Sequence, residues 1–237
     1  MVSRIEAFGI VSWINLFLKI VQRLPVTLII MISSLFFGLL LGVVVAIIRI
    51  RKSPIPYVIA TFYLSFTRCT PALVQLFLIF YGLPTLLMLI NIDINNWDKI
   101  IFVIITFSLH SAAFLSEVIR SAYIAVGNNQ IEAAYSVGMN YTQALKRIIL
   151  PQAFRIALPN LGNSLISLLK ETSLAFTIGI IDIMGQVRII LGNNYGANMF
   201  EVYIIVSLIY WIICLTIERC ISYMEKTFNR GHISISK

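Results

Sequence analysis

Charged residues are scarce in this sequence. Only 12% of its 237 residues are Asp, Glu, Lys or Arg, whereas 59% are hydrophobic. A soluble domain of this size needs a much larger share of charged side chains to cover its surface. The composition therefore excludes an ordinary soluble globular protein and indicates an integral membrane protein, most of whose apolar surface faces lipid.

Residues with catalytic or metal-binding chemistry are few as well. The chain has three cysteines, Cys69, Cys214 and Cys220, and their spacing fits neither a disulfide framework nor a zinc site. No Ser/His/Asp, Cys/His or metal-binding constellation is evident in the sequence. We therefore expect neither enzymatic activity nor a bound cofactor or metal in this chain.

Basic residues outnumber acidic ones by 18 to 10, which gives a formal net charge of +8. The basic side chains fall in the short polar gaps between apolar runs and not on one patch. Such a distribution carries information about membrane topology and does not indicate a nucleic-acid-binding surface. Membrane lipid is thus an expected partner, and nucleic acid is not.

Long apolar runs dominate the rest of the sequence. A membrane-spanning helix needs about 20 apolar residues. Five stretches meet that length, at approximately 24–48, 71–90, 100–119, 161–181 and 200–218. The first run is too long for the apolar region of a cleaved signal peptide, so we expect it to be retained. The sequence predicts one all-α, polytopic membrane domain over residues 1–237, with about five transmembrane helices.

Two further apolar stretches are too short to span a bilayer. Residues 7–18, within an N-terminal segment 1–23, fit an interfacial helix on the outer surface, anchored by Trp13. Residues 55–67 fit a surface helix that leads into the second span.

The distribution of Lys and Arg predicts the orientation of the chain. With the N-terminus outside, twelve basic residues fall in cytoplasmic segments and five in outer segments. Because positively charged loops are retained in the cytoplasm, this pattern favours an outer N-terminus and a cytoplasmic C-terminus. The polar loop at 126–151 would then face the cytoplasm.

That loop has the pattern of two short helices joined at a glycine. Asn128 and Asn129 are candidate N-caps for a first helix, which carries Glu132 in its first turn. Gly138 is expected to end that helix, and a second helix over 141–149 leads to Pro151. Such a pair would form a compact knob able to enter a cleft in a partner and to transmit a rigid-body movement. The alternative is an ordinary connector between two spans.

The spacing in this loop resembles the EAA loop of ABC importer permeases. The matching positions are Glu132, Ala133, Ala134, Gly138, Ile148, Leu150 and Pro151. Further segments, TRCTPALVQLFLIFYGLP (67–84), SAAFLSEVIRSAY (111–123), PQAFRIALPNLGN (151–163) and LKETSLAF (169–176), resemble the polar amino acid branch of that family. The chain departs from the branch at Cys69 and Asn129, where glycine is usual.

The resemblance implies the fold of a type I importer permease in a bacterial plasma membrane. Two permease copies, identical or related, would pair, and the seven matching residues would couple them to ATP-binding cassette subunits. Those subunits would bind Mg-ATP, since this chain has no G-x-x-x-x-G-K-[ST] loop. An extracytoplasmic substrate-binding protein would deliver a polar amino acid. The sequence of 174–179, LAFTIG, is similar to cystine-type permeases.

Charged residues within a span are costly and usually functional. Lys170 and Glu171 fall near the centre of the predicted fourth span, and Thr172 and Ser173 follow them. A polar amino acid needs opposite charges when it leaves water. These four residues, with Gln75 of the second span, are therefore candidates for the substrate path. The alternative is a buried polar clasp that holds the spans together.

Two other polar features have a structural and a functional interpretation each. Glu117 and Arg120 are three residues apart on the third span, which favours a salt bridge on one helix face. The functional hypothesis for the same two residues is a gate contact that breaks during transport. His110, on the same span, is expected to be a packing residue. A rival function, an autonomous transporter or channel driven by an ion gradient, would use Lys170, Glu171 and His110 as a proton relay.

Two glycine patterns predict local helix geometry. Gly38 and Gly42 form a G-x-x-x-G pattern on the first span, which permits close approach of another helix. Gly82 and Pro84 predict a kink or local unwinding in the second span.

Overall fold

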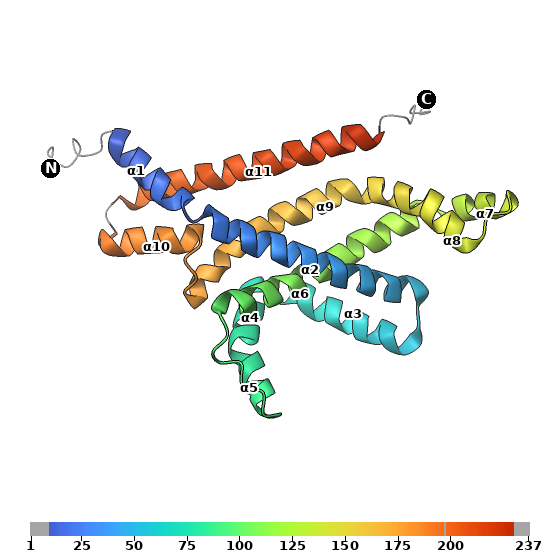
Figure 1. Cartoon of the computed structure of the whole chain (residues 1–237), viewed down its shortest axis with the longest axis horizontal. Helices are drawn as coiled ribbons and strands as arrows, with labels where there is room; N and C mark the ends of the chain where they lie inside the picture. The colour runs from blue at the N-terminus through green and yellow to red at the C-terminus, as the bar shows by residue number, and fades with distance from the viewer. Residues whose placement is uncertain (1–9, 197, 230–237) are drawn as a thin grey trace. The chain divides into compact units, whose positions relative to one another are not determined.

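The computed structural model describes residues 10–196 and 198–229, and all regular secondary structure in this part of the chain is helical (Figure 1). The α-helices are α1 (Ile10–Val21), α2 (Leu24–Arg51), α3 (Pro54–Cys69), α4 (Ala72–Phe77), α5 (Leu83–Met88), α6 (Lys99–Ala125), α7 (Asn128–Ser136), α8 (Tyr141–Ala144), α9 (Leu150–Thr172), α10 (Ile183–Asn193) and α11 (Met199–Asn229). A π-helical turn, Leu78–Gly82, lies between α4 and α5, and a second one, Leu145–Ile149, lies between α8 and α9. A 3₁₀ helix, Ser173–Ile178, follows α9.

Three helical stretches of the described chain are long and apolar enough to cross a membrane, namely Trp13–Arg51, Lys99–Ala125 and Met199–Phe228. Two bent helix pairs, Pro54–Cys69 with Ala72–Met88 and Tyr141–Ile178 with Ile183–Asn193, raise the number to as many as five if each pair forms one span. The all-α polytopic fold with about five spans is thereby confirmed. The orientation of the termini stays a prediction.

The predicted limits of the fourth span were wrong. Helix α9 begins at Leu150, eleven positions before the expected start, and it ends at Thr172. Polar residues such as Gln152 and Asn160 had masked its first half in the hydropathy pattern. Lys170 and Glu171 lie in the last turn of α9, in the interior of the bent pair Tyr141–Ile178 with Ile183–Asn193.

The chain forms two compact units, each assembled from three separate segments. Unit 1 contains residues 1–35, 72–107 and 167–215, and unit 2 contains residues 36–71, 108–166 and 216–237. Helices α2, α6, α9 and α11 each contribute one part to unit 1 and the other part to unit 2.

Unit 1 has an aliphatic core at the junction of α1, α10 and α11. Ile20 of α1, Ile183 and Val187 of α10, and Val202 of α11 are at most 1% exposed and belong to one cluster. Trp13 packs against the same cluster, so part of its ring contacts protein. The position of this N-terminal segment in the membrane interface stays a prediction, and residues 1–9 lie outside the described part of the chain.

Unit 2 is held by a close helix–helix contact. A Cβ added to Gly38 of α2 would lie 3.0 Å from the Ser111 Cβ of α6. One added to Gly42 would lie 3.2 Å from the Leu115 Cβ. The G-x-x-x-G pattern therefore marks a real site of close approach between α2 and α6.

The distortion predicted around Gly82 takes the form of a π-helical turn. The turn at Leu78–Gly82 connects α4 directly to α5, which has Pro84 near its start. Because proline lacks a backbone N–H, it fits best where the α-helical hydrogen-bond pattern is already interrupted, as it is at this π-helical turn.

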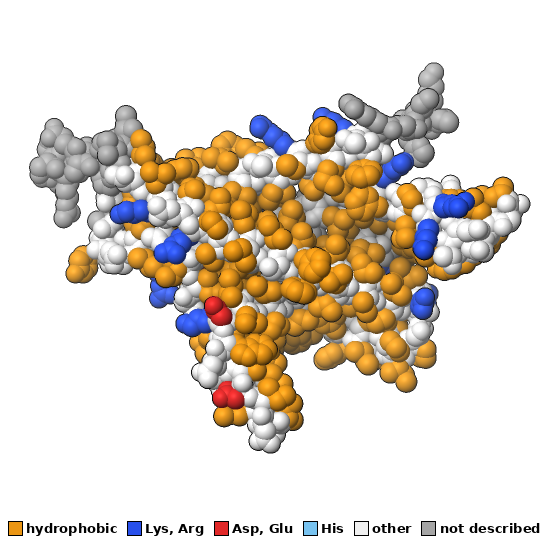
Figure 2. All heavy atoms as spheres, in the orientation of Figure 1, with side chains coloured by type: hydrophobic (Ala, Val, Ile, Leu, Met, Phe, Trp, Pro, Cys, Tyr) orange, Lys and Arg blue, Asp and Glu red, His pale blue; other side chains and the backbone are white. Residues whose placement is uncertain are grey.

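Hydrophobic side chains cover most of the face shown in Figure 2. Exposed large residues of α2 include Ile29, Ile32, Phe36 and Leu40. An apolar surface of this extent is typical of lipid contact.

Candidate functional site

The loop between α6 and α9 forms a helical corner at Gly138. The Gly138 N–H donates to the Tyr135 carbonyl at 2.9 Å, and the Met139 N–H donates to the Ala134 carbonyl at 3.1 Å. This pair of bonds is the Schellman motif, which requires a left-handed residue after the helix. Gly138 adopts φ +81°, which glycine reaches without a steric penalty. The predicted helix end at Gly138 is confirmed.

A capping box begins the next helix. The Asn140 side chain accepts from the Gln143 N–H, and the Gln143 side chain accepts from the Asn140 N–H, both at 2.9 Å. Sequence reasoning missed this box, although its N-x-x-Q spacing is visible. The predicted cap of the first helix was wrong: Gly127 with φ +79° is the N-cap of α7, and Asn128 is its first residue.

Helix α8 continues through the π-helical turn at Leu145–Ile149 into α9 without a break. Pro151 is the second residue of α9 and follows the π-helical turn, so its missing N–H falls where the α-helical hydrogen-bond pattern is already interrupted. Figure 1 shows α7 and α8 folded together beside the neighbouring ends of α6 and α9. Movement of this corner can thus be passed to α9 through continuous helical backbone.

The residues of the EAA pattern divide into an exposed and a buried set. Glu132, Ala133, Gly138, Leu150 and Pro151 are exposed, and Ile148 is half-buried. Ala134 is 1% exposed, so it packs inside the corner and cannot contact a partner. Tyr135, Val137 and Tyr141 add exposed apolar surface next to the seven matching positions. The surface of the corner therefore combines exposed polar side chains with an apolar patch formed by Tyr135, Val137 and Tyr141.

A charged cluster lies on α2 and α6 in the same unit. Arg49 Nη1 and Arg120 Nη2 each donate to the carboxylate of Glu117, and Arg120 Nε donates to Glu117 Oε2 at 3.3 Å. The predicted i,i+3 salt bridge is confirmed. Arg49 was missed, because a partner 68 positions away becomes visible only when α2 and α6 are packed.

Comparison with known proteins assigns the family. Residues 38–230 match the model of the binding-protein-dependent transport system inner membrane component. The chain belongs to this family. It is 43% identical to the L-cystine transport system permease protein TcyL of Bacillus subtilis, over 90% of this chain and 88% of that protein. It is 41% identical to the probable amino-acid permease protein YxeN of Bacillus subtilis, over 92% of this chain and 95% of that protein.

A solved structure agrees with the assignment. The crystal structure of an amino acid ABC transporter with histidines contains a chain that is 32% identical, with a TM-score of 0.80. The match covers 92% of this chain and 98% of that one. The chain is therefore an ABC transporter permease subunit, a membrane component that is not itself an enzyme.

The substrate-path candidates of this permease all fall in unit 1. Gln75 and Thr172 are buried, Glu171 and Ser173 are half-buried, and Lys170 is exposed. The Thr172 and Ser173 hydroxyls donate to the carbonyls of Leu169 and Lys170, both at 2.6 Å. Both hydroxyl protons are thus donated to backbone carbonyls at the end of α9. The charged side chains of this segment are Lys170 and Glu171.

His110 of the permease lies in unit 2. Its side chain is 7% exposed, and its ring centroid is 4.9 Å from that of Phe114. This burial against an aromatic ring fits the predicted packing role. Cys69, Cys214 and Cys220 are all free thiols.

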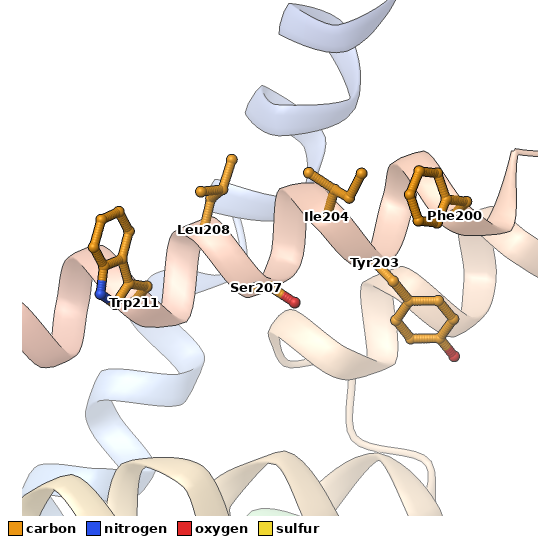
Figure 3. Close-up of a pocket in the computed structure, with 6 residues that line it drawn as sticks. All are labelled: Phe200, Tyr203, Ile204, Ser207, Leu208 and Trp211. Carbon is orange, nitrogen blue, oxygen red and sulfur yellow. The ribbon is translucent and has the colours of Figure 1, made fainter.

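An apolar groove of about 460 Å³ runs along one face of α11 (Figure 3). Its lining residues are Phe200, Tyr203, Ile204, Ser207, Leu208 and Trp211. Figure 3 shows these side chains projecting from the single helix α11. Because all six belong to one face of a candidate span and most of the lining is apolar, the groove is a lipid-compatible surface.

Proposed function

We propose that this chain is the membrane-spanning permease subunit of an ATP-driven importer for polar amino acids, with cystine as the first candidate substrate. The 43% identity to TcyL, an L-cystine transport system permease, supports this choice of substrate. The importer lies in a bacterial plasma membrane, with the N-terminus outside and the α7–α8 corner in the cytoplasm. Its substrate is delivered by an extracytoplasmic binding protein.

The observation that carries the proposal is the exposed corner between α7 and α8. A rigid corner with an apolar patch at Tyr135, Val137 and Tyr141 is suited to a cleft in a partner subunit. The partner is an ATP-binding cassette subunit that binds Mg-ATP, because this sequence has no phosphate-binding loop. Closure of two such subunits moves two corners, one on each of two paired permease copies.

Transport follows from alternating access. Movement of the corner tilts α6 and α9, to which it is joined at Ala125 and Leu150. The cluster of Arg49, Glu117 and Arg120 ties α6 to α2, so that the two helices move as a pair or separate when the cluster breaks. In the second case Glu117 and Arg120 act as a gate.

Recognition of the substrate is assigned to the end of α9. Cystine carries carboxylate and ammonium groups at both ends, and each needs an opposite charge or hydrogen bonds after desolvation. Lys170 is suited to a carboxylate and Glu171 to an ammonium group. Gln75, Thr172 and Ser173 are the polar uncharged candidates in the same unit, and the hydroxyl oxygens of Thr172 and Ser173 can still accept hydrogen bonds.

Co-purification with the ATP-binding subunit tests the coupling role. Val137 is 72% exposed on the corner, so Val137→Asp changes a surface that should be buried in the complex. Leu89, 78% exposed after α5, provides a matched control as Leu89→Asp. We expect the complex to be lost with Val137→Asp and kept with Leu89→Asp, while both permeases elute as folded, monodisperse protein.

A second variant probes the shape of the corner. Gly138→Asp forces a residue with a Cβ into φ +81° and should weaken the same complex. If both Val137→Asp and Gly138→Asp bind the ATP-binding subunit like the wild type, the corner is a structural connector and the coupling proposal is wrong.

A further inference from the structure

Two guanidinium groups share one carboxylate in the α2–α6 cluster. Arg49 and Arg120 both donate to Glu117, the only acid paired with either arginine among the described residues. Two positive charges and one negative charge leave the cluster with a net charge of +1. An uncompensated charge in a partly desolvated position costs free energy, which a bound anion would recover.

Most hydrogen-bond donors of this cluster also have no acceptor within it. Each guanidinium carries five N–H groups. Three donor–acceptor contacts to Glu117 are present, and the buried Arg49 Nε has no acceptor among the described residues. The side chains keep access to the outside, with exposed fractions of 17% for Arg49, 27% for Arg120 and 31% for Glu117. The cluster can therefore accept a further oxygen ligand.

The position along α2 indicates which anion is available. Arg49 lies at the end of the apolar stretch Trp13–Arg51, and Arg51 and Lys52, which follow it, are both exposed. The end of a membrane span lies at the level of the lipid headgroups, where phosphate is the abundant anion.

The neighbouring helix α3 offers a surface for acyl chains. The Tyr63 hydroxyl donates to the Leu109 carbonyl of α6, which holds one side of α3 against the protein. Ile55, Val58, Ile59 and Phe62 of α3 are between 65% and 74% exposed. Their spacing of three and four residues places them on one apolar helix face. A phosphate site and an apolar face thus occur within one unit.

We propose that Arg49 and Arg120 bind the phosphate group of an anionic phospholipid, with Glu117 fixing the two guanidiniums. Guanidinium groups suit this role because their planar donors match phosphate oxygens. A phosphodiester carries one negative charge, which neutralises the net charge of the cluster. Free inorganic phosphate shares this chemistry and is distinguished from the lipid in the experiment.

The test is a lipid titration of the purified full-length chain in a neutral detergent. Dissociation constants are obtained from the thermal unfolding midpoint as a function of phosphatidylglycerol, phosphatidylcholine or inorganic phosphate concentration. We expect phosphatidylglycerol to stabilise the wild type more than phosphatidylcholine does. Arg49→Gln should weaken phosphatidylglycerol binding about tenfold, the loss expected when a hydrogen bond to a charged group is removed. Arg51→Gln, outside the cluster, is the matched control and should change it less.

Glu117→Gln distinguishes an anion site from a purely structural salt bridge. The substitution raises the cluster charge to +2, so phosphatidylglycerol binding should become tighter even if the protein itself loses stability. If Arg49→Gln does not fold, Arg120→Gln removes the other guanidinium of the cluster and should weaken phosphatidylglycerol binding in the same way. Equal losses with Arg49→Gln and Arg51→Gln, or weaker binding with Glu117→Gln, would overturn the proposal. Stabilisation by inorganic phosphate equal to that by lipid would overturn the lipid assignment.

Discussion

The chain turns two corners with the same backbone motif, one at Gly138 and one at Gly179. Gly179 ends the 3₁₀ helix with φ +88°, and its N–H and that of Ile180 donate to the Phe176 and Ala175 carbonyls at 3.0 and 3.3 Å. This is the bond pattern found at Gly138. In both corners a side-chain cap then begins the next helix, Asn140 for α8 and Asp182 for α10.

The surroundings of the two corners differ. Around Gly179, Ala175, Asp182 and Ile183 are not exposed at all, and α10 continues into the aliphatic core of unit 1. Around Gly138, Val137 and Asn140 are exposed, and a Cβ on the glycine would meet nothing within 4 Å. The same turn motif thus forms a buried bend at Gly179 and an exposed corner at Gly138. Burial, and not the turn itself, determines which corner can engage a partner.

The largest predicted effect concerns Gly185, in the first turn of α10. A Cβ at this position would lie 2.3 Å from the Ile180 carbonyl oxygen, so the backbone of the buried corner must move. We expect Gly185→Ala to destabilise the permease by about 3 kcal/mol, near the upper end of the range for overpacking. Thermal unfolding in detergent measures this. The control is Gly192→Ala in the same helix, where no atom lies within 4 Å of the added Cβ. Equal midpoints for the two variants would contradict the close packing of this corner.

The two caps provide a smaller and more direct comparison. The Asp182 carboxylate accepts from the Gly185 N–H at 2.8 Å in a buried site, and the Asn140 side chain accepts from the Gln143 N–H at 2.9 Å in an exposed one. Asp182→Ala should cost about 2 kcal/mol and Asn140→Ala about 1 kcal/mol, since water can replace only the exposed acceptor. Unfolding midpoints of the two variants, measured in one detergent, give the order. The reverse order would show that burial does not strengthen the cap.

Sequence reasoning located the exposed corner better than the buried one. Gly138 was identified because it interrupts a polar, helix-prone loop, where a single glycine stands out. Gly179 lies in an apolar run that was assigned to one continuous span, so hydropathy concealed the break between Ile178 and Ile183. Neither cap was predicted, because a cap depends on backbone angles that residue type only favours.

The charged cluster shows a different limit of the sequence. Glu117 and Arg120 are three positions apart, so helix geometry alone predicts their contact. Arg49 joins them only because Gly38 and Gly42 bring α2 against α6, which fixes the register of its last turns. A G-x-x-x-G pattern indicates that a helix packs closely but does not name its partner. Contacts between distant segments therefore required the structure.

The smallest effect is expected at the two corner glycines themselves. Gly138→Ala and Gly179→Ala each place a Cβ in left-handed geometry, which costs about 1 kcal/mol in either unit. The Lys99 Nζ atom would lie 3.1 Å from the added Cβ at Gly179, and this flexible side chain can move away. The two variants should therefore have similar unfolding midpoints. Their effects on function should differ, because only Gly138 shapes the proposed docking corner.

Gly138→Ala should lower the affinity for the ATP-binding subunit in a pull-down titration. Gly138→Asn should have an affinity between those of Gly138→Ala and the wild type, since asparagine tolerates this geometry better than alanine. Gly179→Ala should leave that affinity unchanged. If Gly179→Ala weakened the complex as much as Gly138→Ala, the loss would reflect general destabilisation, and the exposed corner would have no special role in docking.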